Sequence, residues 1–356
     1  MQIKKDFIGM FDVLKGIGIL LVITVHNLDF TNVAFPGSVV LEFAQNFLDA
    51  DVTIMTLFFI FIGYSFRPTT NMRKFIKKQA KQYLLPYVAV VILVAVTFSF
   101  VKIIRGDFSI GVASAPLLGG LFGFTSTFQL FNRLWIDGVR ALWFLLALFF
   151  GSIIYNLIWQ IKNAKLSMAI IWILTVLAIA VPSSVVRLCP WALVQSCVVL
   201  GFMEVGRLLK KHKLLYKKSN VIFVLAALAL CIFSHMYSYT SMMKNEYRFL
   251  WLDYIEAVMV AVVILKAYLA SSIAISDVFA PLEYVGRYSM WFYCVHAFEY
   301  RVFPWDEGVA MLFPVGISPI CVFLITEAVR IVFAVLVCLC INYIYGKILL
   351  RRLQNE

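Results

Sequence analysis

The stretch "KGIGILLVITVH", residues 15–26, places a lysine and a histidine at the two ends of an almost entirely apolar run. Each residue of a helix turns the chain by about 100°, so Lys15 and His26 fall on one face, about 16 Å apart along the axis. Asp12 precedes Lys15 by three residues and falls near the same face. The stretch therefore predicts an apolar helix with a polar stripe.

The composition indicates that this helix is one of many that lie in a membrane. Of 356 residues, 63% are hydrophobic and 14% are charged, and the mean hydropathy is +0.92. Soluble domains are about 45–50% apolar and about 25% charged. Apolar runs of about 17–25 residues, each long enough to cross a hydrocarbon core of about 30 Å, recur along the chain. We therefore predict an all-α fold, a polytopic transmembrane helix bundle of about ten spans that forms a single domain over residues 1–356. The predicted spans are residues 10–30, 52–68, 84–103, 140–161, 166–186, 190–209, 219–239, 250–273, 284–302 and 318–347.

The formal net charge of +12 is carried mainly by clusters on alternate connections between these spans. Basic residues accumulate on the cytoplasmic side of membrane proteins, so both termini and the even connections are predicted to be cytoplasmic. The default partner of such clusters is the anionic lipid of the bilayer, and no nucleic acid partner is expected. The clusters are Lys4 and Lys5; Arg67, Arg73, Lys74, Lys77, Lys78 and Lys81; Lys162 and Lys165; Arg207, Lys210, Lys211, Lys213, Lys217 and Lys218; and Lys347, Arg351 and Arg352.

The longest connection is the outward segment 104–139, which contains the apolar and glycine-rich sequence "LLGGLFGFTSTFQLFNRLW". We expect a loop or a re-entrant piece packed against the bundle. A long structured loop is often a lid or a platform for a substrate, and a surface loop that only covers helices is the alternative.

Ionisable groups at membrane depth are costly, so each is a candidate functional residue. His26 lies in the outer half of its span, and Gly16 and Gly18 in the same span permit the close approach of another helix. A plain hydrogen-bonded packing role is the alternative for this histidine.

A second histidine, His296, ends the sequence "EYVGRYSMWFYCVH". Ser289 lies seven residues earlier on the same helical face, and Tyr293 and Glu299 lie one turn away on either side. Ser289 and His296 are about 10 Å apart, too far for a nucleophile–base hydrogen bond of about 3 Å, so a serine hydrolase is not indicated. We expect His296, Ser289 and Tyr293 to be structural or substrate-binding polar groups.

Glu327 and Arg330 lie one turn apart in the last span, at a depth where their charges must be satisfied within the bundle. The pair locks helices together or binds substrate, and the sequence leaves both roles open.

The seven cysteines lie in or beside apolar spans without a CxxC motif or metal-ligand spacing to a histidine. They are expected to be small buried hydrophobic residues, and no metal is predicted.

Six motifs, in order along the chain, resemble those of the acyltransferase 3 family of bacterial integral-membrane acyltransferases, and within it the sugar O-acetylases. They are "FDVLKGIGILLVITVHN" (11–27), "FFIFIGYSF" (58–66), "KFIKKQAKQYLLPY" (74–87), "LWFLLALF" (142–149), "LCPW" (188–191) and "VGRYSMWFYCVH" (285–296). The chain departs from the family pattern at three places: Lys15 stands for an arginine, Ile62 for a serine, and Lys78 with Lys81 for an Arg-x-x-Arg pair. Lysine binds phosphate as a point charge and lacks the two-pronged geometry of arginine.

The resemblance implies a multi-pass enzyme of the bacterial cytoplasmic membrane that uses an acyl-CoA, usually acetyl-CoA. It moves the acyl group to a hydroxyl of a carbohydrate at the outer face, such as a polysaccharide of the cell envelope or a lipid-linked sugar. His26 would then be the catalytic general base or acyl carrier, with Lys15 and its partner Asp12 on the same face. The polyanionic CoA would bind the cytoplasmic lysines, and the motif that contains Trp143 adds this residue to the substrate-binding or structural group. The predicted CoA ligands are Lys74, Lys77, Lys78 and Lys81.

A transporter or flippase for a lipid-linked sugar or an acyl donor is the alternative from another functional class. A purely structural or assembly subunit is a further alternative. Inverted repeats and broken helices would favour transport, and the sequence shows neither clearly. The identity of the acceptor and of the acyl group, and the oligomeric state, with a homodimer as one alternative, are left open.

Overall fold

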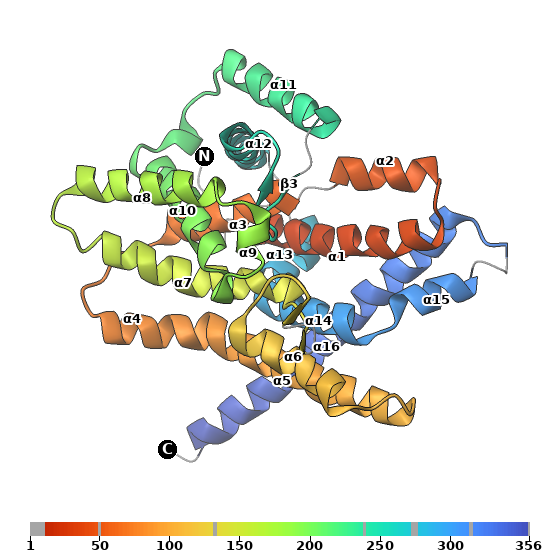
Figure 1. Ribbon diagram of the computed structural model, residues 1–356. Helices are drawn as coiled ribbons and strands as arrows, with labels where there is room; N and C mark the ends of the chain where they lie inside the picture. Colours follow the sequence, from red (N-terminus) through yellow and green to blue (C-terminus); the bar gives the residue numbers. More distant parts are fainter. Residues whose placement is uncertain are drawn as a thin grey trace. The chain divides into compact units, whose positions relative to one another are not determined.

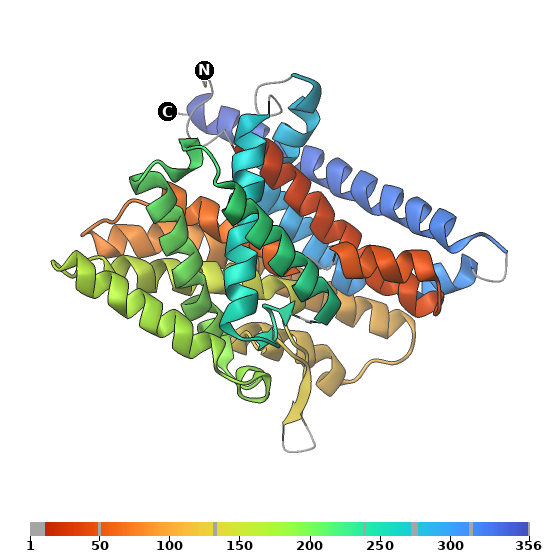
Figure 2. The same ribbon diagram turned by 90° about the horizontal axis from the view of Figure 1, so that it is seen from above.

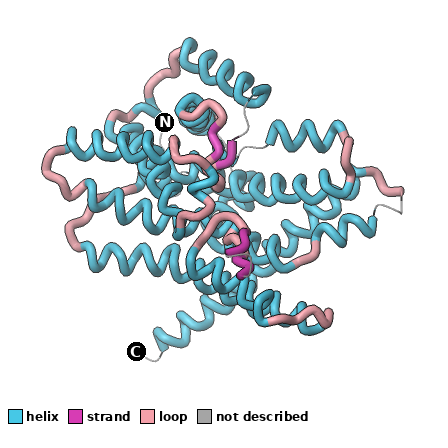
Figure 3. Tube along the Cα trace, viewed as in Figure 1, coloured by secondary structure: helices cyan, strands magenta, loops and turns pink. Residues whose placement is uncertain are grey.

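The computed structural model describes residues 11–48, 51–130, 134–237, 240–271, 277–312 and 316–354. Helices account for most of these residues and the strands are short (Figure 3), which confirms the predicted all-α class. Lys4 and Lys5 of the predicted cytoplasmic N-terminus lie outside the described residues. The chain forms two compact units, one from residues 1–49 and 273–356 and the other from residues 50–272.

The first unit joins the beginning of the chain to its end. Its first helix, α1, packs against α13, α14, α15 and α16 as well as against α2, and Figures 1 and 2 show this helix among them. The helices of this unit are α1 (Asp12–Ala34), α2 (Val39–Leu48), α13 (Ala280–Arg287), α14 (Ser289–Val302), α15 (Trp305–Leu312) and α16 (Pro319–Gln354), with a 3₁₀ turn at Asp277–Phe279.

Two glycines bring the backbones of α1 and α13 into direct contact. A Cβ atom on Gly16 would lie 2.1 Å from the carbonyl oxygen of Leu282, and one on Gly286 would lie 1.6 Å from the carbonyl oxygen of Asp12. Small residues are what allow two helices to approach so closely. The predicted role of Gly16 is thereby confirmed, and the contact fixes the position of α1 in this unit.

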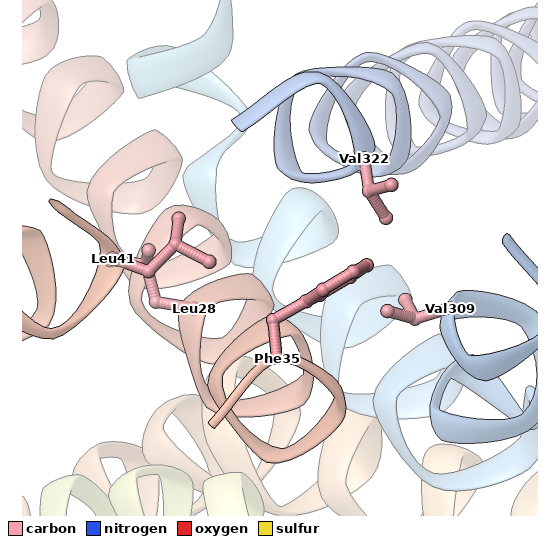
Figure 4. Packing of buried hydrophobic residues seen from close by; sticks show 5 residues of the cluster. All are labelled: Leu28, Phe35, Leu41, Val309 and Val322. Carbon is pink, nitrogen blue, oxygen red and sulfur yellow. The ribbon is translucent and has the colours of Figure 1, made fainter. Parts of the chain in front are cut away.

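An apolar cluster holds the other end of α1. Leu28 and Phe35 pack with Leu41 of α2, Val309 of α15 and Val322 of α16, and all five side chains are buried. Figure 4 shows the ring of Phe35 directed toward the two valines. The close packing of these side chains fixes the C-terminal half of α1 against α15 and α16, because dispersion contacts add up over the cluster.

The second unit is arranged around α10, which packs against α3, α7 and α8. Figures 1 and 2 show α10 between these helices.

A π-helical turn at Ala80–Leu84 joins α4 to α5, so the two form one long helix from Met72 to Ile104. The helices of this unit are α3 (Asp51–Ser65), α4 (Met72–Gln79), α5 (Leu85–Ile104), α6 (Ile110–Phe122), α7 (Trp143–Ile158), α8 (Ala164–Ile179), α9 (Ser183–Val186), α10 (Leu193–Lys211), α11 (Val221–Tyr237) and α12 (Trp251–Ala270). Its strands are β1 (Phe128–Leu130), β2 (Leu134–Ile136), β3 (Thr240–Ser241) and β4 (Glu246–Tyr247), and its 3₁₀ turns are Arg140–Leu142, Pro190–Ala192 and Leu214–Tyr216.

The segment 104–139 contains α6 and an antiparallel pair of strands, β1 and β2. The hydroxyl of Tyr87 on α5 donates a hydrogen bond of 2.6 Å to the carbonyl oxygen of Gly120, which ties α6 to α5. The predicted loop is therefore a helix and a hairpin packed on a neighbouring helix. Its position on the outer side of the membrane stays a prediction.

Among the described residues, five helices are long and apolar enough to cross a membrane: Asp12–Ala34, Met72–Ile104, Arg140–Ile158, Pro190–Lys211 and Pro319–Ile344. Three shorter apolar helices cover Thr53–Ser65, Ala164–Ile179 and Val221–Tyr237. The span predicted over residues 284–302 is divided between α13 and α14, which meet at Tyr288. The structure thus supports an all-α membrane protein, while the count of about ten spans and the side of the termini stay predictions.

Candidate functional site

The two histidines singled out in the sequence lie side by side in the first unit. The rings of His26 on α1 and His296 on α14 are stacked, with centroids 5.2 Å apart and planes inclined by 20°. The ring of Tyr300 lies 4.6 Å from that of His26 and 5.9 Å from that of His296. The packing of α1 against α14 therefore makes one site from two separate candidates.

Each histidine faces a carboxylate three residues later on its own helix. Nδ1 of His26 lies 3.1 Å from Oδ2 of Asp29, and Nδ1 of His296 lies 2.9 Å from Oε1 of Glu299. An ionised carboxylate only accepts hydrogen bonds, so Nδ1 of each neutral ring carries the hydrogen and Nε2 keeps a free lone pair. A nitrogen with a free lone pair can take a proton or attack an acyl carbon.

The surroundings of the two pairs differ sharply. The side chains of His26 and Asp29 are 28% and 40% exposed, whereas those of His296 and Glu299 are 0% and 2% exposed. The two histidines therefore combine one accessible imidazole with one that is shielded from water.

Glu299 is the centre of a buried polar network. Its Oε1 accepts hydrogen bonds from Arg330 on α16, at 3.1 Å from Nε and 2.7 Å from Nη2, in addition to the bond from His296. The indole N–H of Trp305 donates to Oε2 of the same carboxylate. The guanidinium of Arg330 also lies 5.4 Å from the centroids of the rings of Phe30 and Trp305. A buried carboxylate needs such compensation, and the network connects α14, α15 and α16.

Glu327 and Arg330, predicted as a charged pair, bond to different helices. Arg330 donates to Glu299 of α14, whereas Oε1 of Glu327 accepts a hydrogen bond of 2.8 Å from the hydroxyl of Thr24 on α1. Side chains one turn apart need not bond to each other, because both can turn toward neighbouring helices. Both residues connect helices around the histidine site.

Lys15 and Asp12 form the predicted pair at the other end of α1. Their side chains make an ion pair of 2.6 Å, and Asp12 is buried. The rise of a helix separates Lys15 from His26 by about 16 Å, so the lysine does not contact the histidine site. The partnership is confirmed, and a role in the reaction stays a prediction.

Ser289 and Tyr293 lie on α14 before His296. Ser289 is the first residue of the helix and partly exposed, while Tyr293 is buried. Two turns of helix place Ser289 about 10 Å from His296, so the structure does not bring the two together.

The predicted CoA ligands lie in the second unit. Lys74, Lys77 and Lys78 are exposed on α4, which buries Phe75, and Lys81 is exposed on the π-helical turn that follows. A single π-helical turn inside a longer helix often marks a functional site. Because all four lysines are exposed, they present a positive surface, here called the α4 basic surface.

Trp143, at the beginning of α7, is a core residue of the second unit. Its side chain is buried, and its ring packs against those of Phe59 and Phe144 with centroids 6.4 and 6.2 Å away. This position supports the structural interpretation of the residue.

Sequence reasoning missed the roles of three residues at the histidine site. Asp29 is not among the residues that the sequence singled out, although it follows His26 by the three residues that separate His296 from Glu299. That shared spacing could have indicated it. Tyr300 follows His296 by four residues on α14, so the helix period could have indicated it, whereas Trp305 gave no such signal because only the packing of α15 brings it to the site.

Comparison with known families gives one match, to an acyltransferase domain, and it extends over nearly the whole chain. Neither the curated proteins nor the solved structures that were searched gave a match. The six ordered motifs and the two paired histidines fall within the matched residues. Since residues 8–346 match the family's domain, this chain belongs to the acyltransferase 3 family, as its motifs predicted.

Proposed function

We propose that this membrane acyltransferase is an O-acetyltransferase, which moves the acetyl group of acetyl-CoA to a hydroxyl of a carbohydrate. The acceptor is a polysaccharide of the cell envelope or a lipid-linked sugar at the outer face of a bacterial cytoplasmic membrane. The chain crosses that membrane about ten times, with both termini in the cytoplasm. The observation that carries the proposal is the pairing of His26 and His296, each with a carboxylate at Nδ1, in a chain of this family.

The donor follows from the distribution of charge. The nucleotide end of CoA carries several phosphate charges, and the exposed lysines of the α4 basic surface are suited to attract it. Under the predicted topology this surface faces the cytoplasm, where acyl-CoA is found.

His26 is the residue assigned to the transfer itself. It is partly exposed, and with its hydrogen on Nδ1 facing Asp29 it keeps a lone pair on Nε2. Nε2 takes the proton of the acceptor hydroxyl as a general base, or it carries the acyl group as a nucleophile.

The test uses the purified full-length protein in lipid vesicles with radiolabelled acetyl-CoA. The acceptors are envelope glycans and a pool of methyl glycosides, and mass spectrometry locates the acetyl ester. His26→Ala is expected to abolish the transfer, whereas the matched variant His235→Ala, at an exposed histidine of α11, retains it.

Transfer at the parental rate by an inserted His26→Ala protein would contradict the proposal. Movement of a lipid-linked sugar across the vesicle membrane without any acetyl transfer would favour the transporter instead.

A further inference from the structure

Among the described residues, Nε2 of His296 and Nη1 of Arg330 are two of the buried polar atoms near the histidine site that have no hydrogen-bond partner. Both side chains are 0% exposed. Buried polar atoms in native proteins are nearly always satisfied, so each exception calls for an explanation such as a ligand. The two residues share one partner, Oε1 of Glu299.

Glu299 determines which ring nitrogen of His296 carries the hydrogen. Its carboxylate oxygen lies 2.9 Å from Nδ1, closer than Nη2 of Arg330 at 3.5 Å, so we assign the hydrogen to Nδ1 and the lone pair to Nε2. The guanidinium of Arg330 favours the charged form of the carboxylate. The bonds from Arg330 and Trp305 also fix the carboxylate itself. His296 is thus held with a proton-accepting nitrogen in a dry environment, the arrangement that orients the histidine of a Ser-His-Asp triad.

We propose that His296 is the residue that takes the proton from the acceptor hydroxyl, and that Glu299 is its positioning residue. The inference rests on the proposed function and assigns the proton to His296, while His26 contacts the acyl group. The O–H bond of the acceptor breaks and its proton moves to Nε2 of His296. The hydroxyl oxygen bonds to the acyl carbon, and the bond from that carbon to its leaving atom, the sulfur of CoA or Nε2 of His26, breaks. The proton then passes to the CoA thiolate, so the products are the ester and free CoA.

The stacking of the two rings supports the assignment of the proton to His296 and of the acyl group to His26. The ring centroids lie 5.2 Å apart, so an acceptor hydroxyl that donates to His296 is close to an acyl group held at His26. With its hydrogen on Nδ1 facing Asp29, His26 keeps a lone pair on Nε2 that can contact the acyl group. Nη1 of Arg330 supplies an N–H donor for the acyl oxygen as negative charge develops on it.

The test compares two acceptors that differ in their need for a base. A sugar hydroxyl must lose its proton as it attacks, whereas neutral hydroxylamine attacks acyl groups without prior removal of a proton. The full-length protein in vesicles is supplied with acetyl-CoA and either the pool of methyl glycosides or hydroxylamine, and acetyl ester and acetohydroxamate are measured. The spontaneous reaction of hydroxylamine is subtracted.

His296→Gln is expected to lower kcat for the glycosides at least about 100-fold, because general base catalysis contributes about 10²–10⁴. Glu299→Gln is expected to act in the same direction, since a side-chain amide can donate to Nδ1 and so place the hydrogen on Nε2. In both variants hydroxamate formation and the KM for acetyl-CoA are expected to stay within about threefold, because only the proton-accepting step is affected. Glu299→Asp keeps the carboxylate and is expected to restore most of the glycoside activity.

The matched control is Glu204→Gln in the second unit. Glu204 is another fully buried carboxylate, bonded to Arg207 and Tyr155, so its loss imposes a similar folding penalty without touching His296. Where Glu299→Gln does not fold, the result for His296→Gln decides whether the inference holds, because this variant retains the contacts of Glu299 with Arg330 and Trp305.

Equal losses with both acceptors in folded His296→Gln, or unchanged glycoside transfer, would overturn the inference. A parent protein that acetylates neither acceptor would instead refute the proposed function, so the two failures are distinguishable.

Discussion

His26 and His296 stack with ring centroids 5.2 Å apart, and each points Nδ1 at a carboxylate three residues further along its own helix. The two halves of the site thus follow one local pattern on two helices from opposite ends of the chain. One half is partly exposed and the other is buried, so the two histidines have different surroundings.

Asp29→Asn is expected to lower kcat of the transfer about tenfold, less than the loss of about 10⁴ for the buried aspartate of a Ser-His-Asp triad. The smaller effect follows because Asp29 is 40% exposed and water can replace its contact with His26. Acetyl transfer to the methyl glycosides is the measurement. Asp107→Asn, at an exposed aspartate of the second unit, should leave kcat unchanged. Equal rates in the parent and Asp29→Asn would show that Asp29 does not orient His26.

Arg330→Met is expected to lower the free energy of unfolding by about 3–5 kcal/mol, because it leaves Glu299 buried without its cation. The matched change, Arg287→Met, breaks the ion pair of Arg287 with Glu283. Because the side chain of Arg287 is 61% exposed, this change should cost less than about 1 kcal/mol. Unfolding by sodium dodecyl sulfate in mixed micelles compares the two variants. A similar cost for both would mean that burial does not determine the strength of these pairs.

Gly286→Ala is expected to destabilise the protein by about 1–3 kcal/mol, the usual range for overpacking, because its Cβ would meet the backbone of Asp12 at 1.6 Å. Gly308→Ala on α15 meets nothing within 4 Å and should be neutral or stabilise by about 0.5–1 kcal/mol. The same unfolding assay measures both. An unaffected Gly286→Ala protein would mean that α1 and α13 can separate without loss of stability.

Replacement of all four lysines of the α4 basic surface by glutamine is expected to raise the KM for acetyl-CoA about tenfold or more, since a positive surface raises the local concentration of a polyanion. kcat should not change, because these residues do not contact the acyl group in the proposed mechanism. The double variant Lys217→Gln with Lys218→Gln, at exposed lysines of another basic cluster, serves as the control. The KM of the parent should also rise with salt concentration. A KM that is equal in all variants would place CoA elsewhere.

The spacing of residues along single helices predicted much of this protein. The apolar runs predicted the all-α membrane class, and the motifs predicted the family. The three-residue spacing of Asp12 and Lys15 predicted their ion pair, because partners one turn apart meet whenever the helix forms. Glu327 and Arg330 are also one turn apart, but their side chains turn toward α1 and α14 and connect helices, one of the two roles that their depth left open.

The apolar runs thus determined the class, the resemblance of the motifs determined the family, and the two histidines stood out as ionisable groups in apolar spans. Only the tertiary structure decided that these histidines form one site, that Glu299 holds both His296 and Arg330, and that Trp143 belongs to a core. The physical reason is that the 3.6-residue period relates positions on one helix only. Contacts between helices depend on their packing, which the crossing of Gly16 with Gly286 and the cluster around Phe35 establish in the first unit.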